Sequence, residues 1–359
     1  MQSLISYSLV RNILLSTTAL LYASGCAADT TGLDKFPIPS AASEELQNAI
    51  KQGYVYPKEV TASKPTNEQE WQELIETIDG AGITLENLED WFGIEATERN
   101  MGGVLTYELS PPQADKTEPQ SVFLYLHGGA YVFNSGPLGA YEGALIAASA
   151  NIKVIAVDYR MPPSHPYPAA LNDAIQVYKS LLNQYPANKI AIGGSSAGAG
   201  LSMAALQKFQ VMGLPMPGAL YAGSPWSDLS DSSDTLHTLD GIDRVLNTYD
   251  GWLEASALLY ANGTDLKTPY LSPIYGSFEN YPPTYLVSGT RDLLLSDTLR
   301  THRKLLEKEI PVELHILEGL SHVEYTMIPN SPEGQQVYQG LAKFLKSNLK
   351  CPPDFKNVE

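Results

Sequence analysis

The sequence predicts an α/β protein: a mostly parallel central sheet flanked by helices, with an added helical cap. From about residue 101 onward, short apolar runs alternate with helix-like segments, which favours parallel strands joined by helices. The runs are continuously apolar, as in strands buried on both faces. With 359 residues, 43% of them hydrophobic, the chain can form one large domain with an accessory piece.

The expected core comprises residues 101–225 and 276–349, followed by a C-terminal tail at 350–359. Six strands are expected in it, at 122–129, 153–159, 189–194, 219–225, 284–289 and 312–319. The helix-like segments are 138–150, 168–184, 197–211, 297–309 and 333–348. This order predicts a doubly wound sheet.

Two segments are expected to form the cap. Residues 41–100 space apolar side chains at intervals of three and four, which predicts helices, and no strand signal is seen there. Residues 226–275 interrupt the strand–helix alternation with a segment rich in Asp, Ser, Tyr and Gly. This segment is longer than an ordinary connection and is interpreted as a cap insertion.

The N-terminus resembles an export signal. Residues 1–25 carry one charge, then an apolar stretch and small residues, and 26–40 resemble a tether. LLYASGC resembles a lipoprotein processing site, so a lipid on Cys26 would attach an exported protein to a membrane, in the periplasm or at the outer membrane. The alternatives are secretion, with Cys26 free or paired to Cys351, and an uncleaved tail.

Charge and motif content exclude several classes of partner. Lys and Arg total 23 against 40 Asp and Glu, a net charge of −17, which argues against nucleic acid as a partner. No cofactor and no metal are expected, because zinc-type Cys/His spacing is absent and GGSSAGAG lacks the lysine of a phosphate loop. The sequence does not indicate the oligomeric state.

The segment GGSSAGAG (193–200) directly follows the apolar run KIAI. Gly194, Ser196 and Gly198 match a nucleophile elbow, in which a serine on a tight strand-to-helix turn is flanked by small residues. Ser196 is then the candidate nucleophile and Ser195 a spacer. Because glycine-rich turns are common, the motif needs supporting residues elsewhere in the chain.

LHGGAY (126–131) supplies a candidate oxyanion hole after a predicted strand. Paired glycines allow backbone N–H groups to approach a ligand, so Gly128 and Gly129 are expected to donate there. Ala197, directly after the nucleophile, is the third expected donor. His127 is interpreted as bonding its own loop.

His322 is the candidate base among six histidines, because it lies just after the predicted strand VELHILEG, at its carboxyl end. Asp292, just past TYLVSG, is the candidate acid that orients it. Its competitor, Asp297, is expected to cap the following helix. The order Ser196, Asp292, His322 is the chain order of α/β-hydrolases.

Six segments together resemble the bacterial hormone-sensitive-lipase-like carboxylesterases: LHGGAY, DYRMPPSHPYPAALNDA, GGSSAGAG, SPWSDLS, GTRDLLLSD and GLSH. The likeness is greatest to members described as ε-lactone hydrolases or acetyl esterases. It implies the α/β-hydrolase fold and the triad and oxyanion donors named above. Two motifs depart from the family, HGGA for HGGG and GSSAGA for GDSAGG, and the resemblance also implies an ion pair between Asp158 and Arg160.

The predicted function is a serine carboxylic ester hydrolase that acts through an acyl-enzyme on small to medium uncharged acyl esters or lactones. Activity should fall as the pH drops through about 6–7, where imidazole is protonated. The alternatives are an amidase or peptidase with the same triad, and a non-catalytic binding module. Aromatic residues expected to be available to the substrate are Tyr131, Trp226, Trp252 and Tyr325.

Overall fold

The computed structural model describes residues 36–80, 82–111 and 121–349. The predicted signal segment, Cys26, most of the tether and the C-terminal tail lie outside these residues, so the expectations placed on them stay predictions. Within the described ranges no helix has both the length and the apolar character needed to cross a bilayer.

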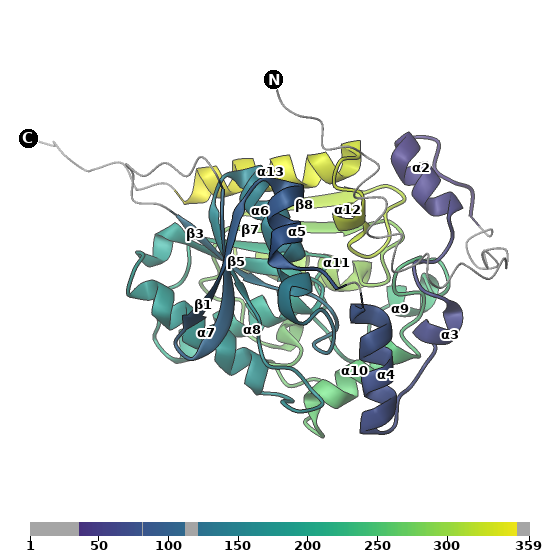
Figure 1. Cartoon of the computed structure of the whole chain (residues 1–359), viewed down its shortest axis with the longest axis horizontal. Helices are drawn as coiled ribbons and strands as arrows, with labels where there is room; N and C mark the ends of the chain where they lie inside the picture. The colour runs from purple at the N-terminus through teal and green to yellow at the C-terminus, as the bar shows by residue number, and fades with distance from the viewer. Residues whose placement is uncertain (1–35, 81, 112–120, 350–359) are drawn as a thin grey trace, which may run out of the picture.

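One eight-stranded sheet runs through the molecule, in the order β1-β2-β4-β3-β5-β6-β7-β8 (Figure 1). The pairs β1/β2 and β2/β4 are antiparallel and all other neighbours are parallel. The α/β-hydrolase fold predicted from the sequence is therefore confirmed. The strands are β1 (Glu95–Met101), β2 (Val104–Ser110), β3 (Val122–Leu126), β4 (Lys153–Val157), β5 (Ile190–Ser195), β6 (Ala219–Gly223), β7 (Thr284–Gly289) and β8 (Val312–Leu317).

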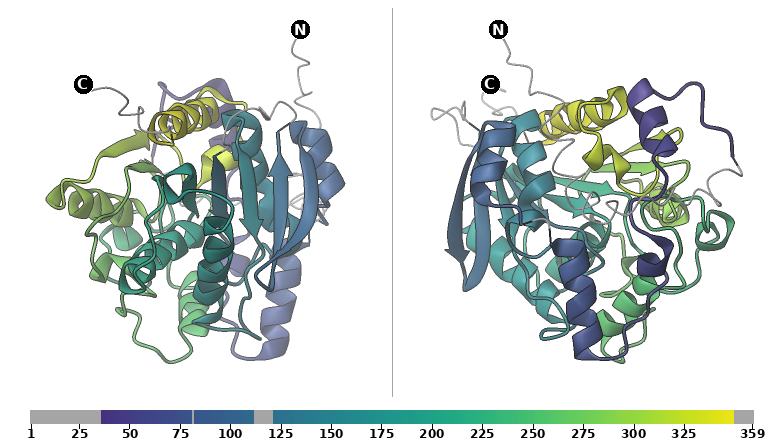
Figure 2. Two further views of the ribbon diagram at one scale, coloured as in Figure 1. Left: turned by 90° about the vertical axis from the view of Figure 1, so that its left-hand side faces the viewer. Right: turned by 45° about the vertical axis from the view of Figure 1, so that its right-hand side comes forward.

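Helices cover both faces of the sheet, and alternate residues of the central strands reach the two layers (Figure 2). In β3, Leu124 and Leu126 belong to the core under α7 and α8, whereas Phe123 and Tyr125 belong to the core under α6 and α13. All four are buried, which explains the continuously apolar sequence of this strand. The helices are α6 (Tyr141–Ala150), α7 (Ala169–Leu182), α8 (Ala197–Val211), α11 (Leu295–Glu307) and α13 (Pro332–Asn348).

The expectation that residues 41–100 form only a helical cap is wrong at its C-terminal end. Glu95–Met101 is strand β1, paired along its length with β2, and helix α5 (Leu85–Phe92) packs on β1 and α6. As an edge strand with most side chains exposed, β1 has the sequence EATERNM, without the apolar alternation that identifies a half-buried strand. The sheet therefore begins six residues before the predicted core boundary.

The remaining cap elements gather at one end of the molecule (Figure 1). They are α3 (Lys58–Thr61) and α4 (Glu68–Asp79) from the N-terminal segment and α9 (Thr235–Thr238) and α10 (Trp252–Ala261) from the insertion. Asp79, at the end of α4, accepts hydrogen bonds from the backbone N–H groups of Asn134 (2.8 Å) and Ser135 (3.2 Å). Helix α2 (Glu44–Lys51) lies elsewhere, beside α13, where Glu333 accepts a bond from the Ser43 N–H (2.8 Å).

Candidate active site

Ser196 lies on the tight turn between β5 and α8. Its backbone has φ 57° and ψ −125°, a strained conformation for a residue with a side chain. A methyl group added at Gly194 or at Gly198 would overlap the carbonyl oxygen of Leu126. The small residues around Ser196 are therefore required by the neighbouring strand, and the predicted elbow is present.

The structure brings the three predicted side chains together. His322 Nε2 lies 2.8 Å from Ser196 Oγ, and His322 Nδ1 lies 2.9 Å from Asp292 Oδ1. All three residues are buried, and Asp292 and His322 follow the carboxyl ends of β7 and β8. The hydroxyl, the imidazole and the carboxylate therefore lie at hydrogen-bond distance from one another in series, which allows a proton to pass from the hydroxyl to the imidazole.

Asp292 is held by several donors besides the histidine. Ser288 Oγ donates to its Oδ2 at 2.6 Å, and the Leu294 N–H donates to its Oδ1 at 2.9 Å. Burial on its own would raise the pKa of Asp292, but the charge and hydrogen bond of His322 and the hydroxyls of Ser288 and Ser224 lower it below its ordinary value. Asp292 is therefore an ionised partner for the imidazole.

The pairing of His322 with Asp292 should affect the pH dependence of kcat/KM. Burial tends to lower the pKa of His322, but the charge and hydrogen bond of Asp292 raise it, and the net pKa lies above the ordinary 6.5. Because the base must be neutral, we expect the acidic limb of kcat/KM for p-nitrophenyl acetate to fall above pH 6.5 rather than below it. A limb centred well below the ordinary pKa of histidine would contradict the assignment of His322.

The predicted oxyanion loop lies against the nucleophile. A Cβ added at Gly128 would lie 3.3 Å from the Cβ of Ser196, which shows how closely this loop approaches the serine. The N–H groups of Gly128, Gly129 and Ala197 donate to no acceptor within the described parts of the chain. Unpaired N–H groups beside a nucleophile can stabilise an oxyanion.

His127 bonds its own loop, as expected. Its Nδ1 lies 2.7 Å from the carbonyl oxygen of Gly128, and its ring stacks on Tyr159 at 4.0 Å between centroids. In a planar trans peptide the C=O and the next N–H point in opposite directions, so holding the Gly128 carbonyl fixes the direction of the Gly129 N–H. Burial lowers the pKa of His127, which keeps the ring neutral in this role.

Ser195 is more than the spacer predicted from the sequence. Its hydroxyl points away from Ser196 and donates to the buried carboxylate of Glu142 at 2.8 Å, with Tyr325 OH 2.9 Å away. Tyr221 and Tyr125 also donate to Glu142, at 2.8 Å and 3.0 Å. Sequence reasoning missed this network, although Glu142 is the one charged residue in the apolar helix YEGALIAASA.

Two further expectations are corrected. Arg160 does not pair with Asp158; its guanidinium binds Asp173 of α7 at 2.7 Å, and Asp158 instead accepts a bond from the Gly136 N–H at 3.0 Å. Asp297 does not cap its own helix. It lies inside the first turn of α11 and accepts the backbone N–H groups of Ser227 (2.9 Å) and Asp228 (2.8 Å).

The aromatic side chains near the site are packed rather than open. Tyr131, in the oxyanion loop, stacks on Tyr260 of α10 at 4.0 Å and lies 6.2 Å from Trp226. Trp252 packs edge-on against Phe133 at 5.1 Å. These contacts place α10 against the oxyanion loop. Tyr325 is not available to a substrate, because its hydroxyl belongs to the Glu142 network.

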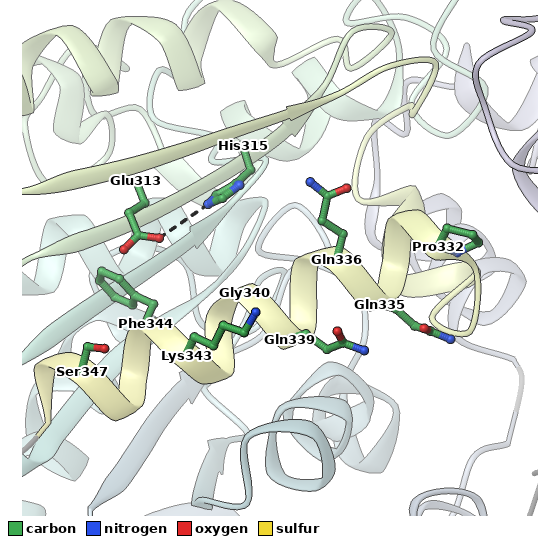
Figure 3. A pocket seen from close by; sticks show the side chains of 10 residues that line it. All are labelled: Glu313, His315, Pro332, Gln335, Gln336, Gln339, Gly340, Lys343, Phe344 and Ser347. Atoms are coloured by element: carbon green, nitrogen blue, oxygen red, sulfur yellow. Dashed lines mark ion pairs between the residues drawn. The ribbon is translucent and has the colours of Figure 1, made fainter.

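A separate cleft of about 590 Å³ lies between β8 and α13 (Figure 3). It is lined by polar side chains such as Gln336 and Lys343, and His315 Nε2 lies 3.7 Å from Glu313 at its edge. No residue of the triad or the oxyanion loop lines it, so it is not the reaction site. In the described ranges no cluster of three or more His, Cys, Asp or Glu side chains is arranged to hold a metal ion.

An elbow serine, hydrogen-bonded to a histidine that a buried aspartate orients, beside free backbone N–H groups, defines a serine hydrolase. Comparison with known proteins agrees: residues 123–326 match a family described as alpha/beta hydrolase fold. Because this match spans more than half of the 359 residues, the chain belongs to that family.

Similar proteins are named as esterases. An acetyl-hydrolase of Streptomyces hygroscopicus is 34% identical over 225 residues, covering 62% of this chain and 75% of its own. The crystal structure of an esterase named E25 has a TM-score of 0.84 and 40% identity, covering 88% of this chain and 97% of its own. An esterase of the bacterial hormone-sensitive lipase family has a TM-score of 0.74 and 29% identity, covering 86% and 100%. The predicted resemblance is confirmed, and the chain is a serine carboxylic ester hydrolase.

Proposed function

We propose that this hydrolase cleaves short, uncharged acyl esters through an acyl-enzyme on Ser196. The observation that carries the proposal is the chain of hydrogen bonds Ser196 Oγ to His322 Nε2 (2.8 Å) and His322 Nδ1 to Asp292 (2.9 Å). Ser196 attacks the ester carbonyl while His322 takes the hydroxyl proton. His322 then returns that proton to the leaving alcohol. In the second half of the reaction, His322 takes a proton from water, the water attacks the acyl-enzyme, and His322 returns the proton to Ser196 as the acid leaves.

The expected oxyanion donors act on the carbonyl oxygen. As the carbonyl carbon becomes tetrahedral, its oxygen gains negative charge, which the N–H groups of Gly128, Gly129 and Ala197 would bind. Donors of this kind are typically worth about 3–4 kcal/mol of barrier each. The N-terminus of α8, which begins at Ala197, adds a favourable dipole at the same place.

Two observations support a preference for short acyl groups. The aromatic side chains of Tyr131, Tyr260 and Trp226 are buried against one another next to the oxyanion loop, which restricts the space there. Two of the similar proteins are named acetyl-hydrolase and, in Pseudomonas putida, ethyl acetate hydrolase. Lactones remain the second substrate class, because they present the same uncharged ester group.

A series of p-nitrophenyl esters tests this proposal. We expect kcat/KM to be highest for acetate or butyrate and about tenfold or more lower for octanoate and palmitate, since each longer chain must displace packed side chains. ε-Caprolactone and a p-nitroanilide serve as the arms for lactonase and amidase activity. Fastest turnover of palmitate, or of the anilide over the matching ester, would overturn the proposal.

A further inference from the structure

Asp243, in the insertion between β6 and β7, is a third acidic residue at the triad. Its side chain is fully buried. One carboxylate oxygen, Oδ2, accepts the backbone N–H of Leu293 at 2.8 Å and the backbone N–H of His322 at 3.2 Å. Leu293 directly follows Asp292. A single oxygen of Asp243 therefore joins the loop that carries the acid to the loop that carries the base.

The second oxygen of Asp243 is equally occupied. Oδ1 accepts the N–H groups of Val245 at 2.8 Å and Leu246 at 3.1 Å, within the same turn. The carboxylate thus faces four N–H donors. A protonated carboxyl would have to direct its own O–H toward one of these donors, so the arrangement suits the ionised form.

We propose that Asp243 is a positioning residue of this esterase: it fixes the acid loop relative to the base loop and places a second negative charge beside His322. The proposal rests on the esterase mechanism proposed above. When Ser196 loses its proton, His322 becomes an imidazolium, and a buried carboxylate nearby stabilises that charge without reorganising. The same carboxylate holds the peptide of His322, which helps keep Nε2 in line with the serine.

The segment around Asp243 is itself anchored on two sides. Arg244 forms a buried ion pair with Glu324 at 2.8 Å, and its backbone N–H donates to Ser321 Oγ at 3.1 Å. Its Nε donates to the carbonyl oxygen of Gly53 at 2.8 Å. The N-terminal segment therefore supports the turn that holds His322, and a cap element contributes to the catalytic geometry.

The charges around His322 are few and mostly negative. The negative charges of Asp292, Asp243 and, more weakly, Asp297 raise the pKa of the imidazole. The opposite charges of Arg244 and Glu324 neutralise each other in their ion pair. The Arg291 guanidinium donates to the Pro37 carbonyl oxygen at 2.7 Å. Burial and the charge of Asp292 raise the pKa of Asp243 to about 6, so Asp243 carries its charge at neutral and higher pH.

Asp243→Asn in the full chain tests the proposal, with Asp173→Asn as the matched control. Asp173 is a comparably buried aspartate of α7 that binds Arg160 and touches no triad residue. Rates for p-nitrophenyl acetate are normalised to active sites titrated with an organophosphonate. We expect Asp243→Asn to lower kcat per titrated site about 10- to 100-fold with little change in KM. The acidic limb of kcat/KM should move down by about half a pH unit or more, because a charge that favours imidazolium is gone.

Asp243→Glu distinguishes the effect of the carboxylate charge from the effect of its position. It also replaces Asp243→Asn as the test if that variant does not fold. It keeps the charge but displaces the carboxylate by one methylene, so kcat should fall while the acidic limb stays in place. The proposal would be overturned if the folded Asp243 variants had the same kcat per titrated site as the wild type and the acidic limb of kcat/KM did not move in Asp243→Asn. Asp243 would then have only a structural role. Failure of the wild-type enzyme to hydrolyse the ester or to be labelled at Ser196 would instead refute the proposed function.

Discussion

Replacing Ser196 with alanine is expected to lower kcat for p-nitrophenyl acetate about 10⁶-fold, with little change in KM. The acyl-enzyme cannot form without the hydroxyl, and His322, 2.8 Å from that oxygen, then has no proton to take. The oxyanion donors and the substrate site stay in place, so a residual rate of about 10³ to 10⁴ over water should persist. Steady-state kinetics measure the loss, and labelling with an organophosphonate should disappear with it.

Ser195→Ala is the matched control for this variant. The two serines are adjacent, but the Ser195 hydroxyl binds Glu142 on the other face of the sheet. We expect Ser195→Ala to keep covalent labelling at Ser196 and to lose about 1–3 kcal/mol of unfolding free energy, because Glu142 and Tyr325 each lose a buried partner. Substantial esterase activity in Ser196→Ala, or loss of labelling only in Ser195→Ala, would refute the assignment of the nucleophile.

The parts of the site that sequence predicted are those fixed by local backbone geometry. A strand followed by small residues around Ser196 predicts an elbow because neighbouring backbone leaves no room for side chains there. The same kind of argument predicts His322 and Asp292, since each follows an apolar strand whose carboxyl end must lie at one edge of the sheet. The order of the strands along the chain is therefore the main evidence in the sequence for the positions of the triad residues.

The parts that sequence missed depend on which distant groups meet. The family resemblance implies a pair between Asp158 and Arg160, but the Arg160 guanidinium binds Asp173, thirteen positions further on, in the following helix. Strand β1 has no apolar period because it lies at the exposed edge of the sheet. Its pairing with β2 is stabilised by backbone hydrogen bonds, which every sequence can supply, so composition gives little sign of it.

The buried carboxylates show the same limit. Glu142 stands alone in an apolar helix, a signal that predicts a buried acid but not its hydroxyl donors, which come from four separate strands and helices. Asp243 lies in an irregular segment and binds only backbone N–H groups, for which no side-chain pattern exists. Acids of this kind become visible only when the tertiary structure places backbone donors around them.

Replacing Asp292 with asparagine is expected to lower kcat about 10⁴-fold while KM stays nearly unchanged. Asp292 Oδ1 lies 2.9 Å from His322 Nδ1 and fixes the tautomer in which Nε2 is free to accept the Ser196 proton. An amide can turn its NH₂ toward Nδ1, which places the ring proton on Nε2, facing the serine. The amide also lacks the charge that stabilises imidazolium, so the rate falls although the side chain keeps its size. Steady-state kinetics at the optimum pH measure this loss.

Asp297→Asn is the control that decides between the two candidate acids. Asp297 is also fully buried and only five positions away, but it accepts the N–H groups of Ser227 and Asp228 rather than a proton of His322. Burial raises the pKa of Asp297 to about 7, so Asp297 is only partly ionised at neutral pH, and a neutral amide removes less charge there than at Asp292, whose pKa is lowered. We expect Asp297→Asn to keep kcat within about tenfold of wild type and to lose stability, because the amide oxygen can keep the two N–H donors but the NH₂ group replaces the oxygen that accepts from Ser233 Oγ and faces Arg300. Equal losses of kcat in the two variants, or a fall of less than tenfold in Asp292→Asn, would remove Asp292 from the triad, since only the orienting acid controls which nitrogen of His322 carries the proton.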